Sequence, residues 1–245
     1  MTIINCNGRY YREINADIER MWKEGIRHLQ LQGVNGHRYI GRALSGEGKI
    51  EIDGVPGDDL GMFMDGPTLV IRGNAQDGVG NTMNSGKIII EGDIRDIAGY
   101  AMRGGKIWVK GNVGYRVGIH MKSYLNDYPV IIVGGSSQDF LGEYMAGGLI
   151  VVLGLGFETN CSPVGKFIAS GMHGGKMFIR GQFQPEQAGP GIGIDQPTSD
   201  DFEEISQYLF EFSQDLNIEI PKLKQEDFVK IYPTTTRPYG RVYAY

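Results

Sequence analysis

The sequence is poor in cysteine and has no excess of basic residues. Its 245 residues include only two cysteines, Cys6 and Cys161, which are too few for a disulfide framework or a four-thiolate metal site. The 24 lysines and arginines stand against 29 aspartates and glutamates, which gives a net charge of −5 at pH 7. Because no surplus of positive charge is available to neutralise a phosphate backbone, we expect no nucleic-acid partner.

Long hydrophobic runs are also missing. The longest apolar run, residues 147–157, is about half the length of a membrane-spanning helix. Residues 1–8 lack the basic stretch followed by an apolar stretch that marks a secretory signal. Hydrophobic residues make up 41% of the chain, which is enough to build a core. We therefore expect a folded cytoplasmic protein without a membrane partner.

Glycine, by contrast, is abundant, and its 38 copies follow a repeat. A short apolar phrase that closes on glycine recurs seven times, and its closing residues are Gly54, Gly73, Gly92, Gly111, Gly134, Gly154 and Gly181. These glycines are 19, 19, 19, 23, 20 and 27 residues apart. A second column, in which methionine follows glycine by three residues, also steps by 19 from Gly61 to Gly118 and then by 24 to Gly142. Two columns with the same basic step indicate a repeat architecture.

A repeat of 19 residues predicts one coil of a solenoid. It is too short for a strand plus a crossover helix, which needs about 30 residues. Two positions of each phrase are always apolar and are expected to face inward as stacked ladders: Ile50, Leu69, Ile88, Ile107, Val130, Ile150 and Met177, with Ile52, Ile71, Ile90, Val109, Ile132, Val152 and Ile179. The methionine column is expected to form a third core ladder. The sequence thus predicts an all-β fold, a parallel β-helix of about seven coils.

The outward positions of the phrases differ from one another. Just before the closing glycine, Asp53, Arg72, Glu91 and Lys110 alternate in charge and predict a surface ladder of ion pairs, which stops at Val133 and Leu153. The other outward position is apolar in six of the seven coils, at Val70, Ile89, Trp108, Ile131, Val151 and Phe178. A solvent-exposed face would not have this composition, so another element must cover it.

A C-terminal helix is one candidate for this cover. Residues 198–216 begin with a capping Thr198 or Ser199 and carry Phe202, Ile205, Leu209, Phe212 and Leu216 at steps of three and four. Such a helix is about 27 Å long, close to the length of the apolar stripe. A partner chain that covers part of the stripe is the alternative.

The chain divides into three segments. Residues 1–45 form an N-terminal cap, with a short helix over 14–25 and strands over 26–34 and 38–44. Residues 46–181 form the β-helix. Residues 182–245 contain a Pro/Gly-rich linker, the C-terminal helix and a tail that pack on the β-helix.

No set of residues predicts catalysis or metal binding by this chain. Cys161 could act as a nucleophile with His120 or His173 as base, but the closing glycines place these histidines three coils apart, which disfavours a shared site. Together with His28 and His37 they lack zinc-ligand spacing. A free-standing β-helix hydrolase or lyase would need clustered carboxylates on one outer face. We predict no catalytic, cofactor-binding or metal-binding residues.

The repeat and the segments around it resemble a known family. Gly142-Glu-Tyr-Met-Ala-Gly-Gly148, Ile150-Val-Val-Leu-Gly154 and Gly171-Met-His-Gly-Gly175 look like the C-terminal β-helix domain of glutamate synthase, which is often named for its Gly-x-Gly-x-Gly repeats. Residues 228–233, Phe-Val-Lys-Ile-Tyr-Pro, are similar to the closing segment of that domain. The resemblance covers roughly residues 40–235 and leaves the tail, 237–245, unmatched. It implies a single-stranded, right-handed parallel β-helix.

The resemblance also implies a function. In that family a glutaminase part releases ammonia, a flavin-binding barrel uses it to make glutamate from 2-oxoglutarate, and the β-helix organises the parts without catalytic residues of its own. The chain would be a separately encoded scaffold subunit with glutaminase and FMN-barrel partners, and FMN and iron–sulfur centres would reside on those partners. The alternatives are a scaffold resembling the β-helix subunit of formylmethanofuran dehydrogenase, or one in an N-methylglutamate synthase-like complex. Self-association is left open.

Overall fold

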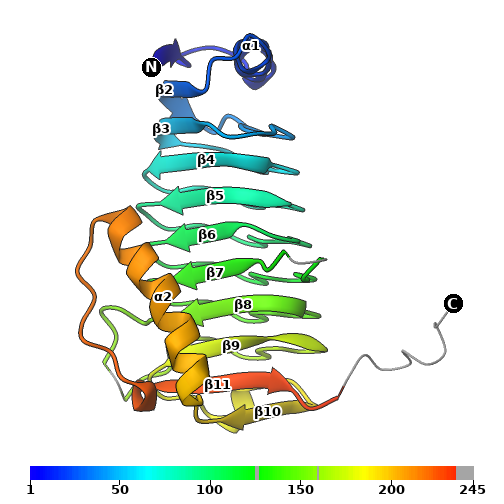
Figure 1. Ribbon diagram of the computed structural model, residues 1–245, viewed down its shortest axis with the longest axis vertical. Coiled ribbons are helices and arrows are strands. Elements are labelled where there is room, and N and C mark those ends of the chain that lie inside the picture. Colours follow the sequence, from blue (N-terminus) through cyan, green and yellow to red (C-terminus); the bar gives the residue numbers. More distant parts are fainter. Residues whose placement is uncertain (125–126, 159, 236–245) are drawn as a thin grey trace, which may run out of the picture.

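The computed structural model describes residues 1–124, 127–158 and 160–235 and shows a parallel β-helix (Figure 1). One 11-stranded sheet runs in the order β1-β2-β3-β4-β5-β6-β7-β8-β9-β11-β10. The strands are β1 (Thr2–Asn5), β2 (His28–Asn35), β3 (Lys49–Val55), β4 (Asp65–Arg72), β5 (Ser85–Ile90), β6 (Lys106–Val109), β7 (Val130–Val133), β8 (Ala146–Val152), β9 (Gly174–Arg180), β10 (Ile192–Asp195) and β11 (Phe228–Pro233). The helices are α1 (Tyr11–Lys23), α2 (Ser199–Leu216) and the short 3-10 turns η1 (Pro185–Gln187) and η2 (Gln225–Asp227). The predicted fold class is confirmed, with about six turns instead of about seven coils.

At the N-terminal end the helix expected over 14–25 is present as α1. Its Ile14, Ile18 and Trp22 are buried in the main core. β2 pairs in parallel with β3, so the stack of strands already includes residues before 46. The strand expected over 38–44 is wrong, because Tyr39, Gly41 and Ala43 have positive φ angles that an extended backbone cannot contain.

The aliphatic ladders form the interior as predicted in six of the seven phrases. Ile50 pairs with Leu69, and Ile52 with Ile71, and the two columns continue through the stack with both members buried. Methionine supplies the third ladder, since the described Met64, Met83, Met102, Met121, Met145 and Met172 all lie in the same core cluster. The methionine column is therefore structural.

The phrase at β7 corrects the predicted register by one residue. Ile131 pairs with Ile107 and Val133 with Val109, so Ile131 and Val133 face the core. Val130 and Ile132, predicted to face inward, lie on the outer face beneath α2. The closing glycine of this coil is Gly135, whose N–H donates to the carbonyl of Gly111 at 2.9 Å, and not Gly134. A one-residue slip reverses every side chain of a strand.

Asparagine and aspartate side chains join successive coils at the corners. Oδ1 of Asn74 accepts the backbone N–H of Asp93 at 2.9 Å, and Oδ1 of Asp93 accepts that of Asn112 at 2.7 Å. A second ladder links Asp96 to the N–H of Tyr115 at 2.9 Å. Each bond supplements the strand ladder where the backbone turns away from it.

The predicted charge ladder forms only at its first step. Arg72 lies 3.8 Å from Asp53 but 2.7 Å from Glu51, a largely buried carboxylate that also contacts Lys49. In the described part of the chain Glu91 and Lys110 make no ion pair with their neighbours in the ladder. Arg72 pairs more closely with Glu51 than with Asp53 because a carboxylate shielded from water attracts the guanidinium more strongly than an exposed one.

The direction of the strands reverses between β9 and β11, at the C-terminal end of the sheet. β11 pairs antiparallel with β9, and β10 pairs antiparallel with β11, so the last coil is followed by a returning strand and an outer one (Figure 1). Among the described residues, neither helix has the length and apolar character needed to cross a bilayer. The expected tail, 237–245, lies outside the described residues.

Candidate interaction surface

The apolar outer face of the sheet is covered by the chain itself. α2 runs along the stack (Figure 1) and buries Ile205, Leu209, Phe212 and Leu216. The ring of Phe212 meets that of Trp108 edge to face at 6.3 Å, and Trp108 and Phe178 are fully buried beneath the helix. Of the two possible covers, the C-terminal helix is the one observed.

Charged groups fasten the C-terminal end of α2 to β5 and β6. Nζ of Lys87 lies 2.5 Å from Glu211 and 2.6 Å from Asp215. Nζ of Lys106 also contacts Glu211, at 2.5 Å, and Nε1 of Trp108 donates to Asp215 at 2.9 Å. Because these lysines come from the strands and the carboxylates from α2, the contacts fix the helix in register with particular coils.

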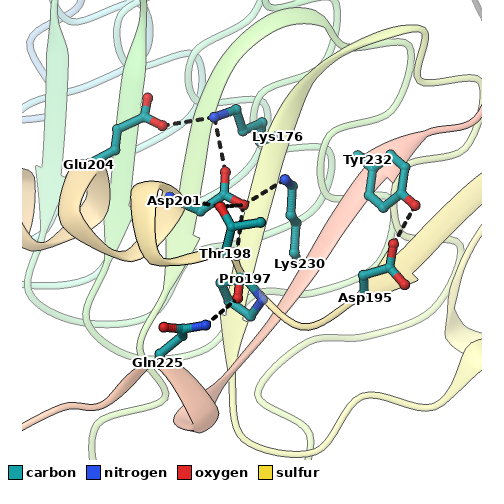
Figure 2. Close-up of polar contacts among 9 residues, drawn as sticks. All are labelled: Lys176, Asp195, Pro197, Thr198, Asp201, Glu204, Gln225, Lys230 and Tyr232. Atoms are coloured by element: carbon teal, nitrogen blue, oxygen red, sulfur yellow. Dashed lines mark hydrogen bonds and ion pairs between the residues drawn. The ribbon is translucent and has the colours of Figure 1, made fainter.

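The N-terminal end of α2 is fastened through Asp201, which is only 4% exposed (Figure 2). Its carboxylate contacts Nζ of Lys230 at 2.6 Å and Nζ of Lys176 at 3.1 Å, and it caps the helix with Thr198. Burial raises the pKa of Asp201, but the hydrogen bonds from Lys230, Thr198 and Lys176 outweigh it and hold the pKa well below its usual range. Both ends of α2 are thus held, and this face is closed.

The segments that flank α2 are fixed near the same place. Figure 2 shows Nε2 of Gln225 donating to the carbonyl of Pro197, at 2.6 Å, and the hydroxyl of Tyr232 donating to Asp195. A surface available to other molecules must therefore be sought elsewhere on the β-helix.

One corner of the stack has an unusual backbone that repeats seven times along the described chain. Three alternate residues have positive φ angles there, for example Arg116, Gly118 and His120 at 56°, 73° and 55°. An ideal Cβ atom on Gly118 would lie 2.5 Å from Cδ1 of the core residue Ile150, so the middle residue must be small. We call the surface formed by the residues from the first to the third of each triplet, together with the two residues that follow, the corner edge.

Exposed aromatic side chains gather on the corner edge. Phe63, Tyr144 and Phe167 occupy left-handed positions and are 44%, 49% and 52% exposed. The rings stack between coils, since His120 lies parallel to Tyr144 with centroids 5.3 Å apart and Phe140 to Phe167 at 5.0 Å. Few backbones place bulky residues at positive φ, and this one does so where the side chains face outward.

A hollow of about 530 Å³ lies in the corner edge and contains two of the histidines considered above. Its described lining is Ala101, His120, Lys122, Tyr144, Ala146, Gly171 and His173. His120 and His173 are two coils apart, since the coil of Tyr144 lies next to that of His120 and the coil of His173 follows it. The count of three coils from the sequence is therefore wrong by one, and the structure brings both histidines to the same hollow.

Cys161 does not join these histidines. It lies exposed, with Sγ 3.5 Å from Oδ1 of Asn160, and is not part of the described lining of the hollow. Cys6 is buried, and burial raises the pKa of its thiol to about 11, which suppresses the nucleophilic thiolate. The Cys–His pairing considered from the sequence is not assembled in the described structure.

The remaining histidines have structural partners. Nδ1 of His37 accepts the backbone N–H of Asn35 at 3.0 Å, and its Nε2 contacts the carbonyl of Arg9 at 3.0 Å. His28 contacts Glu51 at 3.2 Å. Within the described ranges, no group of three His, Cys, Asp or Glu residues is placed to hold a metal ion.

Comparison with known families places the protein. Residues 28–234 match the family model described as the GXGXG motif. The chain belongs to this family. It is the family of the glutamate synthase C-terminal domain.

This GXGXG protein has a full-length relative in Methanocaldococcus jannaschii. The two are 46% identical over 249 residues, which cover 98% of this chain and 95% of the relative. The relative is described as an uncharacterized protein. The matched region therefore makes up most of both chains, which are similar in length.

Proposed function

We propose that this GXGXG protein is a non-catalytic scaffold subunit of a glutamate synthase-type complex, which makes glutamate from glutamine and 2-oxoglutarate in the cytoplasm. It holds a glutaminase subunit and an FMN-barrel subunit in fixed relation, and FMN and iron–sulfur centres belong to those partners. The observation that carries the proposal is the family match over residues 28–234.

The arrangement of the outer surface supports a scaffold role. A stack of coils with continuous core ladders is stiff along its axis, so separate points on its surface keep fixed distances. α2 closes one long face, while the corner edge presents exposed aromatic rings. Aromatic residues at a surface are typical of protein interfaces.

The test is purification of the tagged full chain from its own cells, with identification of every co-purifying chain by mass spectrometry. We expect a glutaminase subunit and an FMN-containing barrel subunit in fixed ratio to the bait. Recovery of pterin-dependent dehydrogenase subunits would replace the proposal with the formylmethanofuran dehydrogenase-like scaffold. Recovery of an N-methylglutamate-forming enzyme would replace it with the other alternative, and a chain that purifies alone would refute a scaffold role.

A further inference from the structure

We propose that the hollow in the corner edge is the docking point for an acidic segment of a partner chain, with an aspartate or glutamate side chain seated between His120, Lys122 and His173. The inference rests on the proposed function, because the partner is a subunit of the same complex. The inference adds to that function the place on this chain where the partner binds and the chemistry by which it is recognised.

The charge of the hollow is opposite to that of the whole chain. Its described lining includes one lysine, Lys122, and two histidines, His120 and His173, and none of the described lining residues is a carboxylate. Arg103 occupies the position equivalent to Lys122 one coil earlier. In a chain of net charge −5, a local concentration of basic groups selects an acidic ligand by charge complementarity.

A carboxylate next to the hollow, that of Glu143, is already occupied. Glu143 precedes Tyr144 and lies 2.9 Å from Nε of Arg116, on the side of the corner edge that faces Phe140. The Arg116 guanidinium also lies over the Phe140 ring, 4.6 Å from its centroid. Glu143 is therefore engaged by Arg116, while Lys122 is exposed and open to an external carboxylate.

The hollow is shaped by small residues between rigid walls. Ala101, Ala146 and Gly171 stand where neighbouring coils carry larger side chains, such as Tyr144 and His173. An ideal Cβ atom on Gly171 would lie 2.5 Å from the Tyr144 ring, so glycine is needed for the ring to lie there. With His120 stacked on its other side, Tyr144 is fixed before binding, which reduces the entropy lost on docking.

Aromatic rings on either side of the hollow supply the rest of the contact. Tyr100 meets His120 edge to face at 6.0 Å, and Phe167 lies one coil beyond Tyr144. Tyrosine and phenylalanine around a polar centre are the usual composition of an interface that binds through a few dominant residues. The apolar groove beside the exposed Phe210 on α2 has no comparable charged centre.

The decisive experiment is zero-length cross-linking of the native complex with a carbodiimide, which joins a lysine amine to a carboxylate that it contacts. The tagged full chain is purified with its partners, treated and digested, and the cross-linked peptides are identified by mass spectrometry. We expect Lys122 joined to an aspartate or glutamate of a glutaminase or FMN-barrel subunit.

Three variants complete the test. Lys122→Glu is expected to reduce partner recovery at least tenfold, because a carboxylate would then face a carboxylate. Lys122→Arg keeps the charge and is expected to retain the partners while losing the cross-link. Lys110→Glu, which changes an exposed lysine on the strand face, is the matched control and is expected to retain both.

The outcomes separate the two proposals. If the wild-type chain recovers the expected subunits, and Lys122→Glu recovers them equally well, the docking site is wrong while the scaffold function stands. A cross-link from Lys122 only to residues of its own chain also refutes the docking site. If the wild-type chain recovers none of the expected subunits, both proposals fail. Circular dichroism of each variant checks that a loss of binding is not a loss of folding.

Discussion

An ideal Cβ atom on Gly111 would lie 2.2 Å from Oδ1 of Asp93, the oxygen that accepts the backbone N–H of Asn112. The same relationship recurs one coil earlier, between Gly92 and Asn74, at 2.1 Å. Because the closing glycine of the repeat has no side chain, it leaves the space that the Asn or Asp side chain of the preceding coil fills. Glycine is required here because a Cβ atom would clash with that side chain, and not for its backbone conformation, since Gly111 and Gly92 have no positive φ angle.

Gly111→Ala is expected to lower the free energy of unfolding by about 2 kcal/mol or more, because the new methyl group displaces Asp93 from its hydrogen bond. The matched control is Gly73→Ala. Val55 stands one coil before Asn74, so no side-chain oxygen lies there, and the nearest atom to a Cβ on Gly73 is the Gly54 carbonyl oxygen at 3.1 Å. Urea unfolding of the two variants measures the difference, and equal losses would refute the spatial explanation.

Ala43→Gly is expected to stabilise the protein by about 1 kcal/mol. Ala43 is exposed and has a φ angle of 53°, where any residue with a Cβ atom is strained. The identical change at Ala16, exposed in the middle of α1, should destabilise by a similar amount because glycine is a poor helix former. Thermal unfolding reports both, and effects of the same sign at the two sites would contradict the left-handed corner.

Acid is expected to loosen α2 through Asp201. The pKa of this group is depressed in the folded protein, so its contribution to stability is present above the unfolded value of about 3.9 and is lost as pH falls toward the folded value. Asp201→Asn should cost about 2–3 kcal/mol at pH 7, and the stability of the variant should decline less between pH 5 and pH 2. Urea unfolding across that range measures both effects.

The control for Asp201 is Glu226→Gln, a change at an exposed carboxylate paired with Lys224. It should leave the pH dependence unchanged. Some acid sensitivity will persist in Asp201→Asn, because the hydrogen bond from Lys49 and other contacts lower the pKa of Glu51 to about 2. Parallel pH profiles for the wild type and Asp201→Asn would show that Asp201 does not hold the helix.

Val109→Asp is expected to prevent stable folding, because it places a carboxylate in the aliphatic ladder between Ile90 and Val133. Its neighbour Lys110 is exposed, and Lys110→Ala should cost less than about 1 kcal/mol. Soluble yield and circular dichroism distinguish the two. Equal tolerance would overturn the assignment of inward and outward faces.

The sequence predicted the ladders wherever the repeat had a single possible alignment. At β7 two glycines in succession, Gly134 and Gly135, allowed two alignments, and the phrase alone favoured the wrong one. The glycine–methionine column steps by 24 at this point and would have selected Gly135. The position of Ile131 against Gly99, whose Cβ would lie 2.5 Å from Cδ1 of Ile131, shows why only one alignment packs.

The corner edge was harder to predict, because its backbone leaves little trace in composition. Positive φ angles at Tyr39, Ile97 or Phe140 contradict the usual preference of these residue types, so local propensity argues against them. Only the stacking of coils compensates the strain, through contacts distant in sequence. The hollow between His120 and His173 depends on that corner and on a correct count of coils, and so it could not be found from residue spacing alone.

The antiparallel strands after β9 also determine how long such a protein can become. A stack that ended on parallel strands at both ends would offer each new chain the same template, and identical molecules could add end to end into a fibre. Here the edge of the last coil, β9, is already paired with β11 in the antiparallel sense, so it is closed to β1 of another molecule. The outermost strand is then the four-residue β10 and not a coil of the repeat, which limits end-to-end growth of the stack.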